Sequence, residues 1–168
     1  SINLEEFNKI TSYEYIDKIL NKIDESKMTK LELFIKKVYE KSKEIKELEG
    51  MGTTIEVALV HNNRVYIGHV GDSRIYRIRK HFMRRLTTDH SYVEKLIKDG
   101  TITRDEAVHH PKKNMLTNAL GCTSFVEPDV SVKGFQKDDI LVLTTDGLTN
   151  MVSDEKIYNI VTDIIEVA

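Results

Sequence analysis

The sequence predicts an α+β fold in which antiparallel strands are covered by amphipathic helices. Apolar residues recur at helical spacing through the first 49 residues, whereas from residue 53 they alternate with a period of two. The strands follow one another through short connections, and parallel pairing would require crossovers of about a dozen residues. Helices and strands are therefore segregated along the chain, as is typical of α+β rather than alternating α/β domains.

Composition limits the classes to which this 168-residue chain can belong. Lys and Arg number 25 against 27 Asp and Glu, and a net charge of −2 does not favour a nucleic-acid partner. The only cysteine, Cys122, excludes an internal disulfide, and we expect it to be buried packing. The apolar runs are too short to span a membrane, and the polar, acidic start is unlike a secretory signal. We expect one cytoplasmic domain over residues 1–168.

Residues 1–49 are predicted to be a helical front. Thr11 with Glu14, and Thr29 with Glu32, have the spacing of a capping box, which satisfies the free amides of a helix start. Apolar residues follow each box every three or four positions, and Gly50 is suited to end the second helix. The charged residues between them are typical of a solvated face.

Residues 50–168 are predicted to be a sheet-rich core. β-branched and apolar runs predict strands at 53–60, 65–70, 73–79 and 82–86, which should form an antiparallel meander. Capping boxes at Ser91 and Thr103 begin two short helices, and residues 109–114 are polar and irregular. Strands at 130–132 and 140–144 follow, and Ser153 caps a last helix with isoleucine and valine on its inner face.

Two aspartates at strand ends are the main candidates for chemistry. Asp72 follows an apolar strand in Val-Gly-Asp-Ser-Arg, and Asp146 follows another in Thr-Thr-Asp-Gly-Leu. A stiff strand holds a carboxylate at a defined place, which suits a hard divalent cation, and the adjoining glycine allows a sharp bend. A simple turn would use the same Gly-Asp pair, so each aspartate alone has two interpretations. Asp89 fits a turn or the start of a helix. His109 and His110 suggest a metal pair, but adjacent side chains point apart.

Five motifs, taken in order, resemble one protein family. They are Met-Gly-Thr-Thr (51–54), Val-Gly-Asp-Ser-Arg-Ile-Tyr (70–76), Leu-Thr-Thr-Asp-His-Ser (86–91), Asn-Met-Leu-Thr-Asn-Ala-Leu-Gly (114–121) and Asp-Ile-Leu-Val-Leu-Thr-Thr-Asp-Gly-Leu (139–148). Their order and spacing are similar to the bacterial metal-dependent Ser/Thr protein phosphatases of the 2C type, the PPM family. The likeness covers residues 51–165, and residues 1–49 fit the two helices that precede the family's Gly-Thr-Thr strand by pattern alone.

The resemblance implies a β-sandwich covered by helices, with a two-metal site at one end. In the family, Mn or Mg ions lower the pKa of a bound water, and the hydroxide attacks the phosphorus of phosphoserine or phosphothreonine. By match to the motifs, Asp146 with Gly147 lies at the catalytic ion pair, and Asp72 binds a third, weaker ion. No other catalytic residue is assigned. The implied partners are phosphorylated proteins and an opposing Ser/Thr kinase in a signalling system.

Residues from about 100 to 116 resemble the mobile flap beside the family's site, which would influence substrate access. The resemblance therefore places four residues on the substrate side: His109, His110, Asn114 and Thr117. A plain surface loop would have the same polar, irregular composition.

The chain also departs from the family pattern. Residues 1–50 lack the Asp-Gly-Met-Gly-Gly-type motif that supplies the bridging Asp, together with the family's phosphate-binding Arg, and no Asp-Asn motif follows Ser153. Two divalent ions repel strongly, so Asp72 and Asp146 alone would not hold them. We expect a phosphatase core truncated at both ends, inactive or nearly so, whose uncovered strand edges favour self-association.

Two other functions stay open from the sequence. One is a non-catalytic, phosphatase-like binding module, and the other is a related phosphatase that acts on an anti-sigma-factor antagonist. The two missing motifs in the natural gene would separate the enzyme from the module, and substrate identity would separate the two phosphatases.

Overall fold

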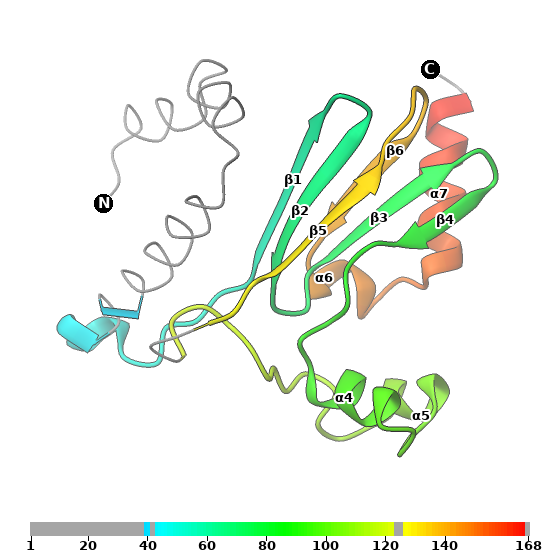
Figure 1. The fold of residues 1–168 in the computed structure, drawn as a ribbon. Helices are drawn as coiled ribbons and strands as arrows, with labels where there is room; N and C mark the ends of the chain where they lie inside the picture. Colours follow the sequence, from blue (N-terminus) through cyan, green and yellow to red (C-terminus); the bar gives the residue numbers. More distant parts are fainter. Residues whose placement is uncertain (1–38, 41–42, 123–125, 167–168) are drawn as a thin grey trace. The chain divides into compact units, whose positions relative to one another are not determined.

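The computed structural model describes residues 39–40, 43–122 and 126–166 (Figure 1). The chain divides into two compact units, Ser1–Phe34 and Ile35–Ala168, and all described residues belong to the second. The capping boxes predicted at Thr11 and Thr29 lie outside the described residues. A 3-10 turn, η2 (Lys46–Leu48), precedes Gly50, whose φ of 75° suits the end of a helix. The expectation of one domain over residues 1–168 stays a prediction.

Six strands form two three-stranded antiparallel sheets, with orders β1-β2-β5 and β4-β3-β6 (Figure 1). The strands are β1 (Ile55–His61), β2 (Arg64–Val70), β3 (Arg74–Arg79), β4 (Phe82–Arg85), β5 (Asp129–Gly134) and β6 (Ile140–Thr144). Asn62 and Asn63 both have positive φ between β1 and β2, the geometry of a two-residue hairpin turn. The predicted α+β class with antiparallel sheets is therefore confirmed.

The predicted four-stranded meander is wrong at one junction. β1 pairs with β2 and β3 pairs with β4, but β2 and β3 belong to different sheets. The link between them contains Gly71, whose φ of 111° turns the chain from one sheet into the other. The connection is short, as predicted, but it joins two layers rather than two neighbours in one layer.

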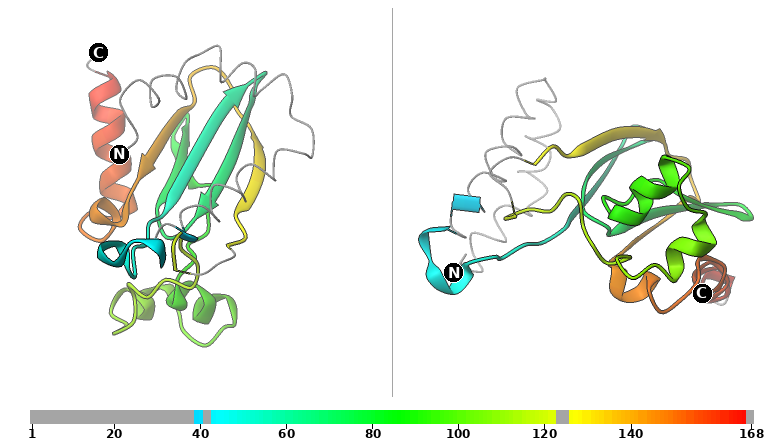
Figure 2. Two further views of the ribbon diagram at one scale, coloured as in Figure 1. Left: turned by 90° about the vertical axis from the view of Figure 1, so that its left-hand side faces the viewer. Right: turned by 90° about the horizontal axis from the view of Figure 1, so that it is seen from below.

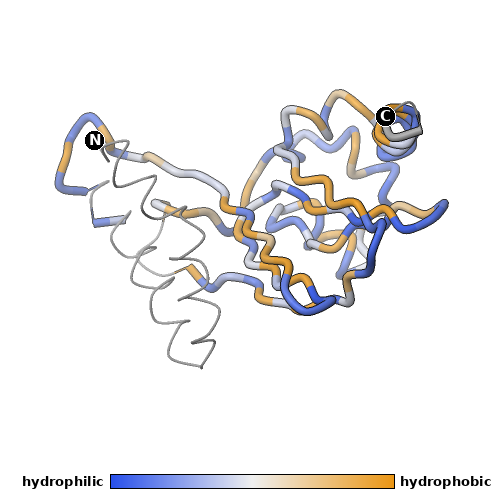
Figure 3. Tube along the Cα trace, turned by 90° about the horizontal axis from the view of Figure 1, so that it is seen from above, coloured by the Kyte–Doolittle hydropathy of each residue, from blue (hydrophilic) through white to orange (hydrophobic). Residues whose placement is uncertain are grey.

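The core lies between the two sheets. Val65 and Ile67 of β2 and Ile75 of β3 are at most 2% exposed and pack together, with Leu86 and Leu141 against them. Figure 3 shows the apolar stretches that run along the strands of both sheets. Alternate residues of β2 therefore face inward, as the period of two in the sequence predicts.

Two short helices, α4 (Tyr92–Lys98) and α5 (Arg104–Val108), lie between β4 and β5, and α6 (Asp146–Thr149) and α7 (Asp154–Glu166) follow β6. α4 and α5 lie at one end of the two sheets, and α7 runs along the β4-β3-β6 sheet (Figures 1 and 2). Thr103 and Glu106 form both halves of the predicted capping box. Only half of the box at Ser91 forms, because the carboxylate of Glu94 binds arginines instead.

The inner face predicted for α7 is partly wrong. Ile157 is 3% exposed and Val161 is half-buried, whereas Ile160 and Ile164 are mainly exposed. Residues 157 and 161 are four apart and share one row of the helix, and this row is the one that faces the protein. Cys122, expected in the interior, is also exposed.

Valines lie on the outer face of the β1-β2-β5 sheet. Val57, Gly68 and Val130 are in register across its three strands, and Tyr66 pairs with Val132. The three valines are about half exposed. Self-association through this face or through strand edges stays a prediction. Within the part of the chain that the structure describes, no helix is long and apolar enough to cross a membrane.

Candidate functional site

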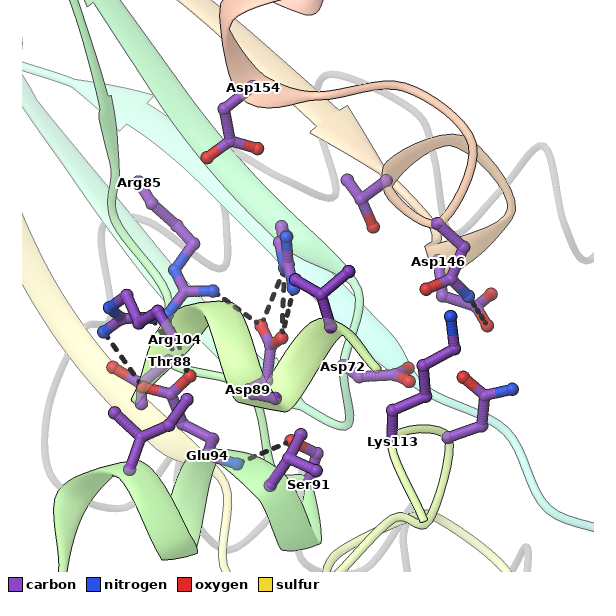
Figure 4. Close-up of a pocket in the computed structure, with 18 of the residues that line it drawn as sticks. Asp72, Arg85, Thr88, Asp89, Ser91, Glu94, Arg104, Lys113, Asp146 and Asp154 are labelled. Atoms are coloured by element: carbon purple, nitrogen blue, oxygen red, sulfur yellow. Dashed lines mark hydrogen bonds and ion pairs between the residues drawn. The ribbon is translucent and has the colours of Figure 1, made fainter. Parts of the chain in front are cut away.

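A pocket of about 700 Å³ lies at the end of the sheets that carries α4 and α5 (Figure 4). It brings together the turn after β2, the end of β6, the loop after β4 and the first residues of α7. Its polar lining residues include Asp72, Arg74, Arg85, Asp89, Glu94, Arg104, Lys113, Asn114, Asp146, Asn150 and Asp154. The pocket therefore joins segments that are more than 70 residues apart in the sequence.

Asp72 sits in a turn that neighbouring loops hold tightly. A side chain on Gly71 would place its Cβ 2.3 Å from Thr54 Cγ2, so only glycine fits between the turn and β1. The hydroxyls of Thr54 and Ser73 are 2.8 Å apart. His90 clamps Gly71 from the other side, because its amide donates to Gly71 O at 2.7 Å and its Nδ1 accepts from Gly71 N at 3.2 Å. These contacts hold the backbone of the turn that carries Asp72.

Asp146 sits in a more open place. It is the first residue of the single-turn helix α6, immediately after β6, and its side chain is exposed. Asn150, one turn later, donates its side-chain amide to Asp146 Oδ2 at 3.2 Å. Gly147 lies within α6 and does not line the pocket, and a Cβ there would meet nothing closer than Thr145 Oγ1 at 3.5 Å.

Asp72 and Asp146 are electrostatically coupled. The pKa of Asp72 is raised, first because burial penalises its charged form and then because the negative charge of Asp146 opposes it. Figure 4 shows both carboxylates on one side of the pocket, where the side chain of Lys113 also extends toward Asp146. Two like charges held together in this way form a place where a cation would relieve the repulsion.

Asp89 and Arg74 form the strongest ion pair in the pocket. Arg74 Nη2 is 2.6 Å from Asp89 Oδ2, its Nε also donates to both carboxylate oxygens, and the Asp89 side chain is 8% exposed. The pKa of Arg74 is raised, because hydrogen bonding and charge attraction from Asp89 outweigh the burial that would lower it. Asp89 is thus more than a turn residue, since it fixes Arg74 beneath the pocket.

A buried tyrosine extends this pair toward α7. Arg74 Nη1 donates to the hydroxyl of Tyr76 at 3.3 Å, and that hydroxyl donates to Asp154 Oδ1 at 2.9 Å. Tyr76 is fully buried, and burial is the main reason why its pKa is raised. The chain of contacts ties the loop after β4 to the start of α7 across the pocket floor.

Of the four residues predicted on the substrate side, the structure places one in the pocket and three outside it. Asn114 lines the pocket, but His109, His110 and Thr117 do not. His109 caps the end of α5, and His110 Nδ1 accepts the amide of Lys112 at 3.1 Å. Thr117 donates its amide to His90 O at 2.8 Å, which attaches the segment to the clamp around Gly71. Roles for these residues and motion of the 100–116 segment stay predictions.

Comparisons with known proteins give the family. The pattern of the family described as Protein phosphatase 2C matches residues 5–96, more than half of the chain. The chain belongs to this family. The resemblance drawn from the five sequence motifs is therefore confirmed.

Several phosphatase 2C relatives are similar over about two thirds of the chain. The serine/threonine phosphatase stp of Listeria monocytogenes is 46% identical over 114 residues, which cover 68% of this chain and 45% of that protein. The protein phosphatase PhpP of Streptococcus pneumoniae is 44% identical over 119 residues, covering 71% and 48% of the two chains. This phosphatase 2C chain thus spans about half the length of the curated relatives it matches.

Solved phosphatase structures share the fold. The S. agalactiae serine/threonine phosphatase superposes with a TM-score of 0.75 at 38% identity, covering 83% of this chain and 59% of that one. The catalytic domain of the phosphatase PstP, solved in complex with two manganese ions, gives a TM-score of 0.66 at 33% identity, with 74% and 51% coverage. The fold predicted for a phosphatase 2C chain is therefore present.

The pocket of this phosphatase 2C chain contains some, but not all, of the ligands that a hard divalent cation needs. Asp72 and Asp146 supply carboxylate oxygens, the ligands that Mn²⁺ and Mg²⁺ prefer. Among the described residues, however, no three His, Cys, Asp or Glu side chains are grouped so that they could hold a metal ion together. The shortage of carboxylates expected from the sequence stays a prediction.

Sequence reasoning missed most of the basic residues around the pocket. Arg74 and Tyr76 are two apart on a strand and share a face, so their common direction was available from the period of two. Arg85, Arg104 and Lys113 gave no such signal, because they come from three segments that only the tertiary fold brings together.

Proposed function

We propose that this chain is the metal-binding core of a protein Ser/Thr phosphatase, with Asp72 and Asp146 as ligands of divalent cations. The observation that supports it is the pair of coupled carboxylates in one pocket, fixed at the ends of β2 and β6. Such an ion, when bound, would polarise water and the phosphoryl group. Membership of a family whose curated relatives are named serine/threonine phosphatases supports the substrate class.

The chain's own residues would shape the rest of the pocket. Asp89 holds Arg74 through several hydrogen bonds, and Tyr76 donates to Asp154, so these side chains fix one another inside the pocket. The metal would be Mn or Mg, and the substrates would be phosphoserine and phosphothreonine proteins produced by a Ser/Thr kinase. We place this activity in cytoplasmic signalling, which the lone cysteine of the sequence supports.

Manganese titration of the 168-residue chain tests this proposal directly. We expect paramagnetic broadening of the backbone NMR signals around Asp72 and Asp146, with weak affinity because only two carboxylates converge. Asp146→Asn should reduce the broadening strongly, and Asp163→Asn, an exposed aspartate on α7, should leave it unchanged. Broadening that survives in both Asp72→Asn and Asp146→Asn would place the ion elsewhere and reject the assignment.

Hydrolysis of a phosphothreonine peptide by the same chain measures how complete the site is. Of the five carboxylates that line the pocket, Asp89, Glu94 and Asp154 are engaged by arginines or by Tyr76, which leaves Asp72 and Asp146 for an ion. We therefore expect little or no turnover, even with excess Mn²⁺. Robust metal-dependent turnover that is lost in Asp146→Asn would show that the described residues supply a sufficient ligand set. It would support the phosphatase and contradict our ligand count.

A further inference from the structure

On the side of the pocket away from Asp72 and Asp146, Arg85 and Arg104 lie around Glu94 (Figure 4). Arg85 comes from β4, Arg104 from the first position of α5, and Glu94 from α4 between them. Arg85 Nη2 lies 3.3 Å from Glu94 Oε2, and Arg104 Nη2 lies 3.4 Å from Glu94 Oε1. Two guanidinium groups therefore share one carboxylate.

These contacts are long, in contrast to those of Arg74. Arg74 makes a short ion pair of 2.6 Å with Asp89 and has further bonds from Nε, so its donors are committed. Arg85 reaches Asp89 only at 3.4 Å, and the contacts of Arg104 lie at 3.4 and 3.5 Å. A guanidinium has five N–H donors, so Arg85 and Arg104 retain donors that Glu94 does not satisfy.

Exposure and surroundings favour a ligand here. The side chain of Arg104 is 65% exposed and that of Arg85 is 19% exposed, so one is free to move and the other is partly shielded. Apolar side chains line the same end of the pocket: Val93, Ile97, Ala107 and Val108. A planar guanidinium suits a carboxylate or phosphate, because its parallel N–H groups can donate to both oxygens.

We propose that Arg85 and Arg104 form a subsite for a second anionic group of the substrate, next to the phosphorylated residue. The group is a carboxylate of a flanking Asp or Glu, or a second phosphate, since both offer paired oxygens to a guanidinium fork. This inference rests on the proposed phosphatase function. It makes Arg85 and Arg104 specificity-determining residues that select acidic or multiply phosphorylated sequences.

Peptide binding to the ¹⁵N-labelled chain tests the subsite. Three phosphothreonine peptides of equal length are compared: one with neutral flanks, one with Asp and Glu flanks, and one with a second phosphothreonine. We expect the anionic peptides to shift the side-chain Nε–Hε signals of Arg85 and Arg104 and to bind roughly three- to tenfold tighter than the neutral peptide at low salt. The preference should shrink at high ionic strength. A preference confined to one anionic peptide would identify the group as carboxylate or phosphate.

Variants separate the subsite from general charge. Arg104→Gln alone, and Arg85→Gln with Arg104→Gln, should remove the preference while the neutral peptide binds as before. Arg84→Gln is the matched control, because Arg84 neighbours Arg85 on β4, is exposed and does not line the pocket. Equal binding of all three peptides, unmoved arginine signals at millimolar peptide, or a preference that survives in the double variant would each overturn the proposal.

The metal gives an independent readout. The subsite needs no divalent cation, so the arginine shifts should appear with and without diamagnetic Mg²⁺, whereas the phosphatase assignment depends on Mn²⁺ broadening at Asp72 and Asp146 in a separate titration. Arginine shifts without that broadening would reject the metal assignment and leave the anion subsite standing. Broadening at Asp72 and Asp146 without the arginine shifts would reject the anion subsite and leave the metal assignment standing.

Discussion

The two candidate metal ligands sit in turns of very different rigidity. Asp72 is half-buried in a turn that Thr54, Ser73 and His90 contact from both sides. Asp146 is exposed at the start of a four-residue helix, where the side-chain amide of Asn150 donates to its carboxylate. The comparison teaches that one ligand is placed by the fold before any ion arrives, while the other retains freedom to adjust. Rigid and adjustable ligands together suit a cation whose coordination must change during a reaction.

Substitution of the glycine beside each aspartate gives the strongest test of the difference between the two turns. Gly71→Ala should destabilise the chain by about 2 to 4 kcal/mol, because the new Cβ would overlap Thr54 and the φ of 111° is strained for alanine. Gly147→Ala should change stability by less than about 1 kcal/mol, since alanine favours a helix and meets no close atom. Urea unfolding of both variants measures the difference. Equal effects would show that the two turns are equally rigid.

A buried pair, His69 and Glu56, lies next to the turn that carries Asp72. His69, 1% exposed, faces Glu56 with Nδ1 and donates from Nε2 to Thr88 O at 2.8 Å. Burial alone would lower the pKa of His69, but Glu56 beside it raises that pKa above 6.5, and burial raises the pKa of Glu56. Both shifts mean that the folded pair retains its shared proton more tightly than the unfolded chain does.

Glu56→Gln should therefore lower the pKa of His69, because the group that attracts its proton is removed. In the unaltered chain this pair stabilises the fold fully below pH 6.5, and the stabilisation is lost as pH rises through the raised pKa of His69. The variant should lose this slope, as measured by urea unfolding at several pH values and by NMR titration of His69. A His69 pKa that does not change would contradict the pairing. Amide shifts should change at residues 70–73 and 88–90 but not at 146–150, where no such pair was found among the described residues.

The sequence predicted the fold well where local pattern decides it. Alternation placed the strands to within two or three residues. It failed at Gly71, because a short Gly-Asp link is compatible both with a hairpin in one sheet and with a step between two sheets. Only the packing of Val65 and Ile67 against Ile75 decides between them. Local propensity contains no information about which layer a strand joins.

In the candidate site, too, the sequence predicted the residues that follow a local pattern and missed those that only tertiary structure brings together. Asp72 and Asp146 were found because each follows an apolar strand, a position that sequence alone can read. Arg85, Arg104 and Glu94 were not found, since each looks like an ordinary solvated charge in its own segment. Glu94 even fitted the N3 position of a capping box, but it binds the two arginines instead. Side chains that meet only through tertiary structure leave no mark in local spacing.

The smallest effect that we predict concerns the coupling between the two turns. Removing the charge of Asp146 with Asp146→Asn should lower the pKa of Asp72, because one cause of its raised value disappears while burial remains. NMR titration of the Asp72 carboxyl carbon measures this, and Asp163→Asn on α7 controls for net charge. A Glu at position 146 should restore part of the shift, because the exposed α6 allows the longer side chain to keep its charge in the pocket. If Asp146→Asn leaves the pKa of Asp72 unchanged, the adjustable turn moves away from the rigid one in solution, and one ion could not contact both carboxylates without drawing α6 inward.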